Sequence, residues 1–164
     1  MKLPANTVQT SYVSPLGRLI LASADGQLVG TWFADQAHLP DLSACPLDDH
    51  NPLMQQAITQ LNGYFGGLRT GFDLPLNTGT GTAFQQAVWQ ALLSIPWGSC
   101  CSYSALGKRI GKPAAVRAVG AAVGRNPLSI IVPCHRVIGA NGSLTGYAGG
   151  LPRKTALLQL EGAL

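Results

Sequence analysis

The stretch from Pro75 to Gly81 divides this chain into two parts with different sequence patterns. It contains no charged residue and is dense in turn-forming residues, so it predicts a linker. Patterns typical of β-strands dominate before it, and apolar residues at helical spacing dominate after it. We therefore expect an α+β protein, with an N-terminal domain at residues 1–77 and a C-terminal domain at residues 78–164.

The N-terminal part is predicted to hold antiparallel strands and one helix. Residues 17–23 and 27–33 flank an Asp-Gly pair, which is a strong signal for a short β-hairpin. Asn51 and Pro52 then begin a helix, with Asn as the cap and Pro at the first helical position. A glycine pair ends this helix, and its apolar stripe consists of Leu53, Ala57, Leu61 and Tyr64.

The C-terminal part is predicted to be helical. Thr82 and Gln85 have the spacing of a capping box and begin a helix that ends before Pro96. Two shorter helices follow at residues 102–110 and 114–123, the second started by a proline. A glycine-containing turn joins them within a basic region, which favours helix-turn-helix geometry.

The helix at residues 114–123 carries one long polar side chain, Arg117. A helix that reads the major groove needs several Arg, Asn or Gln side chains, so this helix cannot read a base sequence. Its small residues instead allow close approach to a minor groove about 6 Å wide. The alternative is that its alanines simply form a good helix packed on a neighbour, but the basic context favours DNA binding.

Charge is distributed unevenly between the two parts. Residues 1–77 have three basic and six acidic side chains, a formal charge of −3, whereas residues 78–164 have eight basic side chains and one acid, a charge of +7. A positive field confined to one part indicates a polyanionic partner. A merely solvated basic surface is the alternative, and no amphipathic segment has the bulky apolar face that membrane binding requires.

The sequence indicates a cytoplasmic protein without cofactors. No apolar run approaches the roughly 20 residues that cross a bilayer, and residues 1–17 lack the apolar core of a secretory signal. The four cysteines include an adjacent pair and no C-x-x-C motif, and there are three histidines, so neither a disulfide framework nor a zinc site is predicted. We expect free thiols, no metal and a monomer.

Cys134 has the most suggestive surroundings of the four cysteines. It follows the apolar run 129–132, which predicts a buried strand or core segment, and a proline that ends this run. A thiol reacts as the thiolate, and nearby cations lower its pKa. Arg136, His135 and Lys154 are candidates for that cationic environment. Adjacent residues on a strand do not face each other, so His135 needs a turn, a helix or a bridging water to assist Cys134.

Two further features lie downstream. A predicted helix from Leu151 ends near Glu161, which is the only glutamate of the chain and the only acid after residue 77. Glu161 is either a helix-end carboxylate or the group that orients His135 in a Cys-His-carboxylate arrangement. The loop 139–150 has five glycines, which favour close approach to a flat ligand with Tyr147 stacked on it, although an ordinary surface loop has the same composition.

The C-terminal part resembles the O6-alkylguanine-DNA alkyltransferases, also called methylated-DNA–protein-cysteine methyltransferases, of the bacterial constitutive type. The motifs that carry the resemblance occur in family order between residues 82 and 162. They are Phe-Gln-x-x-Val-Trp, Ile-Pro-x-Gly, Ser-Tyr, Ala-x-Arg-Ala-Val-Gly, Asn-Pro, Pro-Cys-His-Arg-Val and Gly-Tyr-x-Gly-Gly. The resemblance implies a ribonuclease H-like N-terminal domain and a winged helix-turn-helix-like, all-helical C-terminal domain.

The resemblance also implies a single-turnover reaction that repairs double-stranded DNA independently of its sequence. Cys134 would accept the alkyl group from O6 of guanine, and from O4 of alkylated thymine, after His135 removes its proton through a water. Glu161 would orient His135, and Asn126 would brace the same network. The other implied roles are proton donation and base extrusion by Tyr103, a place near the thiolate for Lys154, filling of the base stack by Arg117, DNA contacts by Ser104, Lys112 and Ala115, and pocket lining by Val137, Tyr147, Ala148 and Val123.

Some residues depart from the family pattern, and two other functions compete. Cys100 and Cys101 stand where bulkier aliphatic residues are usual, Gly107 replaces alanine, and Arg125 is an added charge. One rival function is that of the alkyltransferase-like lesion-binding modules, which lack the acceptor cysteine. The other is a cysteine hydrolase, since Cys, His and Glu can form a triad.

Overall fold

The structure is a computed structural model that describes residues 1–164, and its N-terminal region (residues 1–77) is built on a three-stranded antiparallel sheet. Strands β1 (Val8–Ser14), β2 (Gly17–Ala24) and β3 (Gln27–Phe33) lie in the order β1-β2-β3. Asp25 and Gly26 both have positive φ, 52° and 75°, so the expected two-residue hairpin turn is confirmed.

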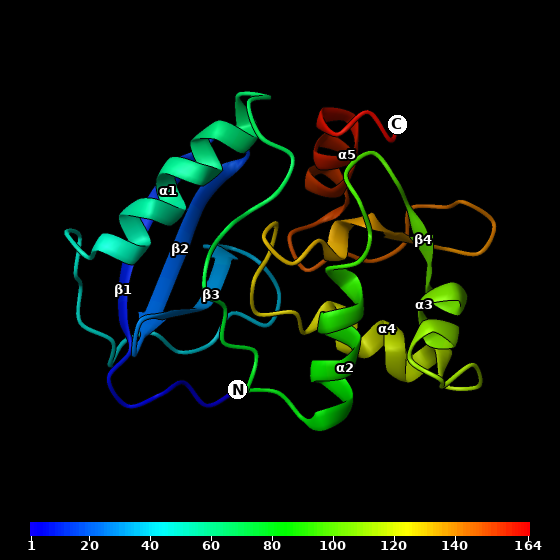
Figure 1. Cartoon of the computed structure of the whole chain (residues 1–164), viewed down its shortest axis with the longest axis horizontal. Helices are drawn as coiled ribbons and strands as arrows, with labels where there is room; N and C mark the ends of the chain where they lie inside the picture. Colours follow the sequence, from blue (N-terminus) through cyan, green and yellow to red (C-terminus); the bar gives the residue numbers. More distant parts are fainter.

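Helix α1 (Pro52–Phe65) packs across one face of this sheet, as Figure 1 shows. The side chain of Asn51 accepts a hydrogen bond from the backbone N–H of Met54 at 3.1 Å, which confirms the predicted cap. The buried face of the helix consists of Met54, Ala57, Gln60, Leu61 and Tyr64, and the predicted Leu53 packs against the core while only half-buried.

The C-terminal region (residues 78–164) is mainly helical. Thr82 and Gln85 form the predicted capping box at the start of its first helix. The elements in chain order are α2 (Ala83–Leu92), β4 (Cys101–Ser102), α3 (Tyr103–Arg109), α4 (Val116–Gly124), the 3₁₀ helix η1 (Cys134–Arg136), β5 (Val137–Ile138) and α5 (Leu151–Leu160). None of the helices is long and apolar enough to cross a bilayer.

Two local predictions for this region need correction, and a third, which left two forms open, is decided. It is not all-helical, because β4 and β5 pair in parallel as a two-stranded sheet. Helix α4 begins at Val116 rather than residue 114, because the Ala115 N–H donates to the Lys112 carbonyl at 3.0 Å and closes a turn first. Residues 129–132 are a buried core segment but not a strand, since the backbone turns at Ile130 with φ of 73°.

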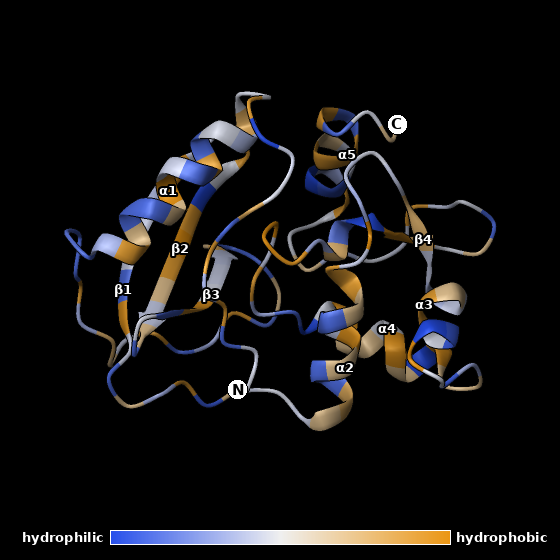
Figure 2. Cartoon of the chain, in the orientation of Figure 1, coloured by the Kyte–Doolittle hydropathy of each residue, from blue (hydrophilic) through white to orange (hydrophobic).

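The two regions share one hydrophobic core. A cluster of 24 buried residues includes Leu21 and Phe33 of the sheet, Leu61 of α1, and Trp89 and Leu157 of the C-terminal helices. In Figure 2 the hydrophobic colour covers much of β2, α2 and α4, which all contribute residues to this cluster. The helices of the C-terminal region therefore rest on a core to which both regions contribute.

Candidate active site

The segment before Cys134, residues 126–133, is attached to the sheet of the N-terminal region. The backbone N–H of Thr31 in β3 donates to the Pro127 carbonyl, and the Thr31 carbonyl accepts from the Ser129 N–H, both at 2.9 Å. The Thr31 hydroxyl adds a hydrogen bond to the Ser129 carbonyl at 2.7 Å. The nucleophile candidate therefore follows a segment that the first region holds in register.

Asn126 braces this segment from within. Its amide nitrogen donates to the Val132 carbonyl at 2.9 Å, and its oxygen accepts from the Leu128 N–H at 3.0 Å. The backbone N–H of Cys134 also donates to the Val132 carbonyl, at 2.8 Å. Because both bonds converge on Val132, Asn126 helps to fix the position from which Cys134 enters the 3₁₀ helix η1.

The thiol of Cys134 is buried, and burial raises its pKa. The Asn126 side chain and the positive charge of Lys154 oppose this effect without reversing it. The expectation that Arg136 would help to lower this pKa is wrong, because its guanidinium is bonded to Glu161 and to the Ile95 carbonyl. Cys134 is therefore a neutral thiol at pH 7 and needs a base in order to react.

The surroundings of His135 fit those of a base. Its Nε2 lies 2.8 Å from Oε2 of Glu161, and an ionised carboxylate only accepts hydrogen bonds, so Nε2 carries the proton. Burial lowers the pKa of His135, and the Arg136 and Lys154 charges act in the same direction against the pull of Glu161. The imidazole is therefore neutral at pH 7, and Nδ1, buried without a protein partner, has a lone pair that can take a proton.

Glu161 is a buried carboxylate at the C-cap of α5. It therefore lies at a helix end and also contacts His135, so the two predicted descriptions of this residue do not exclude each other. It accepts from Nε and Nη2 of Arg136 at 2.7 and 3.0 Å and from the Tyr64 hydroxyl at 2.6 Å, in addition to His135. Burial alone would raise its pKa, but these donors outweigh burial and hold the pKa at about 2. Glu161 therefore stays ionised throughout the working range of pH.

Lys154 holds the glycine-rich loop (residues 139–150) beside the thiol. Its fully buried ammonium donates to the carbonyls of Val137, Thr145 and Gly146 at 2.5, 3.2 and 3.0 Å. Because its three donors are all used on backbone oxygens, Lys154 fixes the loop and acts on Cys134 only through its charge.

A pocket of about 240 Å³ opens next to Cys134. Pockets for drug-sized ligands have volumes of roughly 300–1,000 Å³, so this pocket suits a smaller group such as a single base. Val137 is not in its wall: its side chain is buried in the core, and only its carbonyl reaches Lys154. The wall is formed by Ala37, His38, Tyr103, Gly120, Val123, Gly124, Cys134, Gly146, Tyr147 and Ala148.

The aromatic residues of the pocket are held by the loop itself. The Tyr103 hydroxyl donates to the Thr145 carbonyl at 3.0 Å. At Gly149 a Cβ would lie 2.7 Å from the Tyr147 ring and 2.9 Å from the Phe33 ring, so only glycine fits there. This glycine thus serves packing within the protein, in addition to any ligand that the loop approaches.

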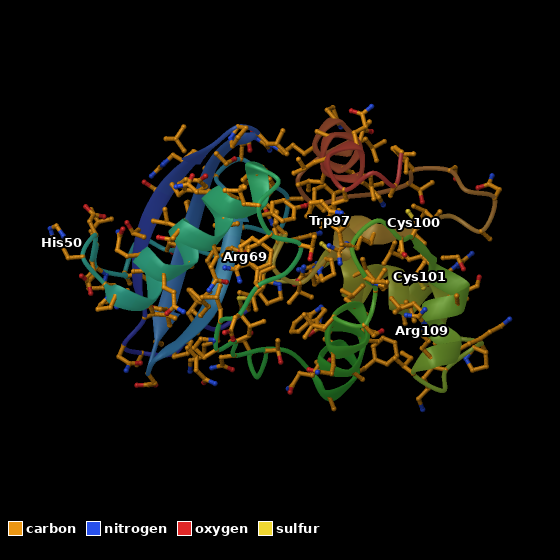
Figure 3. All side chains as sticks on the ribbon, turned by 45° about the horizontal axis from the view of Figure 1, so that its top comes forward. His50, Arg69, Trp97, Cys100, Cys101 and Arg109 are labelled. Carbon is orange, nitrogen blue, oxygen red and sulfur yellow. The ribbon has the colours of Figure 1, made fainter.

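Helices α3 and α4 form the outer surface beside the pocket. Arg117 is exposed, and no hydrogen bond or ion pair of the structure uses it, while Lys112 is exposed in the turn. Ser104 is half-buried near the start of α3, and Ala115 is half-buried at the N-cap of α4. Figure 3 shows that Arg109 lies at the same edge of the molecule, on α3. The expected DNA-contacting residues thus lie on these two helices and the turn between them.

Comparisons with known proteins agree with this geometry. A family model described as 6-O-methylguanine DNA methyltransferase, DNA binding domain, matches residues 83–163, and one described as its ribonuclease-like domain matches residues 7–78. A methylated-DNA–protein-cysteine methyltransferase of Mycobacterium leprae is 49% identical over 90% of this chain and 88% of that protein. The chain belongs to this methyltransferase family.

Other relatives place the chain in the same family. A methylated-DNA–protein-cysteine methyltransferase of Haemophilus influenzae is 44% identical over 93% of this chain and 84% of that protein. The crystal structure of Mycobacterium tuberculosis OGT in complex with DNA superposes with a TM-score of 0.89 and 48% identity, covering 93% of this chain and 92% of that one. The expected α+β fold class is confirmed.

Sequence reasoning missed several contributions from the N-terminal region to the site of this methyltransferase. Tyr64 was counted only in the apolar stripe of a helix, yet it donates to Glu161. Ala37 and His38 line the pocket, and the Ala37 N–H donates to the Ala148 carbonyl at 2.9 Å. No local pattern marks these residues, because each contact joins positions far apart in the chain.

Acidification should destabilise this methyltransferase through Glu161. Its folded pKa of about 2 is below the ordinary value of 4.5, so its contribution is fully present above pH 4.5 and is lost as the pH falls towards 2. The contribution is on the order of 3 kcal/mol, and buried His135, with a lowered pKa, acts in the same direction below its ordinary value of 6.5. Urea unfolding at several pH values in this range measures the pH dependence of the free energy of unfolding. The same pH dependence in Glu161→Gln as in the wild type would contradict the assignment to Glu161.

Proposed function

We propose that this chain repairs double-stranded DNA by moving an alkyl group from O6 of guanine, and from O4 of alkylated thymine, permanently to Cys134. The observation that carries the proposal is a buried thiol in a base-sized pocket, followed at once by a neutral histidine whose Nε2 is fixed by Glu161. A cytoplasmic location and a monomeric state belong to the same proposal.

The reaction is one displacement with balanced proton transfers. His135 takes the Cys134 proton at Nδ1 through a bridging water, and Glu161 stabilises the imidazolium that results. The thiolate attacks the alkyl carbon, so a carbon–sulfur bond forms as the bond from carbon to O6 breaks. Tyr103, at the pocket wall, would then donate its hydroxyl proton towards the departing base instead of towards Thr145.

The base must leave the duplex before it can enter the pocket. We propose that α4 lies in the minor groove and that Arg117 fills the vacated position in the stack. The exposed, unpaired Arg117 and the small residues around it support this role, and binding independent of sequence follows from the lack of base-reading side chains. Ser104, Lys112 and Ala115 would contact the DNA backbone.

Replacing Arg117 with alanine should separate base extrusion from chemistry. Extrusion costs a few kcal/mol, so losing the filling side chain should slow repair of duplex DNA by about tenfold or more. Reaction with free O6-benzylguanine should change little, because that substrate needs no extrusion. Arg18→Ala removes another exposed arginine, on β2, and serves as the control. Equal losses on both substrates would contradict the role of Arg117.

Two other functions are separated from this proposal by one experiment. The protein is incubated with duplex DNA that carries a single O6-methylguanine, and the Cys134 peptide is examined by mass spectrometry. We expect one methyl group per protein molecule, on Cys134, with guanine restored. An unmodified thiol together with tight lesion binding would favour a non-catalytic module, and repeated turnover of a small ester would favour a hydrolase.

A further inference from the structure

Tyr64 extends from the N-terminal region into the hydrogen-bond network of the active site. It lies in the last turn of α1 and is fully buried. Its hydroxyl donates to Oε2 of Glu161 at 2.6 Å, and this is the oxygen that also lies 2.8 Å from Nε2 of His135. A single carboxylate oxygen therefore connects the first region to the catalytic base.

The ring of Tyr64 is held by three aromatic neighbours. Its centroid lies 5.2 Å from that of Phe65 and 5.5 Å from that of Trp97, both edge to face, and 5.4 Å from that of Phe72. Figure 3 shows Trp97 in the middle of the molecule, between α1 and the C-terminal region. These three contacts pack the ring on several sides and orient its hydroxyl towards Glu161.

The distribution of donors on Glu161 distinguishes two readings of this contact. Nε of Arg136 binds Oε1, whereas Oε2 accepts from His135, from Nη2 of Arg136 and from Tyr64. A buried tyrosine that only needed an acceptor would be satisfied by any free carbonyl. Tyr64 instead donates to the more crowded oxygen, so it competes with His135 for the negative charge of that atom.

We propose that Tyr64 is a positioning residue that fixes Glu161 and, through it, sets the proton affinity of His135. The predicted effect of Tyr64 on catalysis rests on the proposed alkyl transfer. The predicted effect of Tyr64 on the titration of His135 does not depend on that function. The charged or titratable groups around His135 are Cys134 and Arg136 of η1, Lys154 of α5, Glu161 at the C-cap of α5, and Tyr64 of α1.

The direction of the effect follows from the sharing of charge on Oε2. Without the Tyr64 hydroxyl, Glu161 keeps more negative charge towards His135 and stabilises the imidazolium better, so the pKa of His135 rises. Only neutral His135 can take the thiol proton. The acid limb of the alkylation rate should therefore move to higher pH.

The test compares Tyr64→Phe with wild type in two measurements. NMR of isotope-labelled histidine measures the titration of His135. The pH profile of the reaction with free O6-benzylguanine measures how the alkylation rate depends on the protonation state of His135. We expect both midpoints to rise by about one pH unit, a tenfold change in the protonation equilibrium. Tyr12→Phe is the matched control, since Tyr12 donates to Asn62 at 2.5 Å in the same region but outside the network.

An unshifted His135 midpoint in Tyr64→Phe would overturn the proposal, even if the variant unfolded more easily, since packing alone explains lower stability. If Tyr64→Phe does not fold, difluorotyrosine at position 64 keeps the ring and makes the hydroxyl a stronger donor. It should move the His135 midpoint to lower pH, and no movement would overturn the proposal. If the wild type takes no methyl group from an O6-methylguanine duplex, the proposed function fails while the His135 titration still tests Tyr64.

Discussion

Cys134→Ala should abolish alkyl transfer and leave lesion binding intact. The substitution removes one sulfur atom from the pocket and leaves unchanged the exposed surface of α3 and α4, on which the proposed DNA contacts lie. Because alanine has no group that can form a bond to the alkyl carbon, no residual rate is expected. Mass spectrometry of the protein after incubation with O6-methylguanine duplex measures transfer, and fluorescence anisotropy measures binding to the same duplex.

Cys100→Ala is the matched control for this experiment. Cys100 is the exposed one among four free cysteines, so it is the thiol that a small reagent reaches most easily. Partial loss of solvent around its sulfur raises the pKa of the Cys100 thiol, and no hydrogen bond in the structure joins it to a base. The control should react as wild type does. If transfer persists in Cys134→Ala and disappears in Cys100→Ala, the acceptor is Cys100 and the proposed role of Cys134 is wrong.

Glu161→Gln should slow alkylation of free O6-benzylguanine by about a hundredfold or more, the range that general-base assistance contributes. A glutamine amide can donate to Nε2 of His135, which would place the imidazole proton on Nδ1 and remove the lone pair that the thiol needs. The buried guanidinium of Arg136 also loses its counter-charge, so the protein should unfold more easily by about 3–5 kcal/mol.

Two measurements separate these effects. Rates are taken under conditions where circular dichroism shows the variant folded, and unfolding by urea is measured separately. Asp41→Asn makes the same chemical change at an exposed carboxylate that accepts from the Ser43 backbone at 2.9 Å, and it should keep the wild-type rate. An unchanged rate in folded Glu161→Gln would reduce Glu161 to a helix-end carboxylate.

The sequence predicted those elements whose signals are local. The Asp-Gly turn, the Asn51 cap and the capping box of Thr82 are each determined by a few adjacent residues, and the structure has all three. The start of α4 was misplaced because a proline is compatible with both a turn and the first turn of a helix. Residues 129–132 were open to a strand reading because an apolar run reports burial and not backbone direction.

The candidate site shows the same division. The residues around Cys134 could be named because they are close in sequence or belong to a recognisable set of motifs. The net direction of the Cys134 pKa could not, since it depends on how deeply the thiol is buried and on where Arg136 points. The contact of Tyr64 with Glu161 could not be predicted, because the two residues are 97 positions apart. An apolar stripe also does not show where a tyrosine hydroxyl within it will lie.

The long sequence separation of these contacts has a consequence for synthesis of the protein. The carboxylate that fixes His135 is translated 26 residues after it, and Thr31 pairs with a segment 98 residues downstream. Non-local contacts of this kind form late, after loop closure has been overcome. A nascent chain that already contains Cys134 and His135 therefore has no oriented base until α5 has been made and has docked. We therefore expect the single irreversible reaction proposed for each molecule to wait until α5, the last helix of the chain, has docked, even though α3 and α4 are made before Cys134.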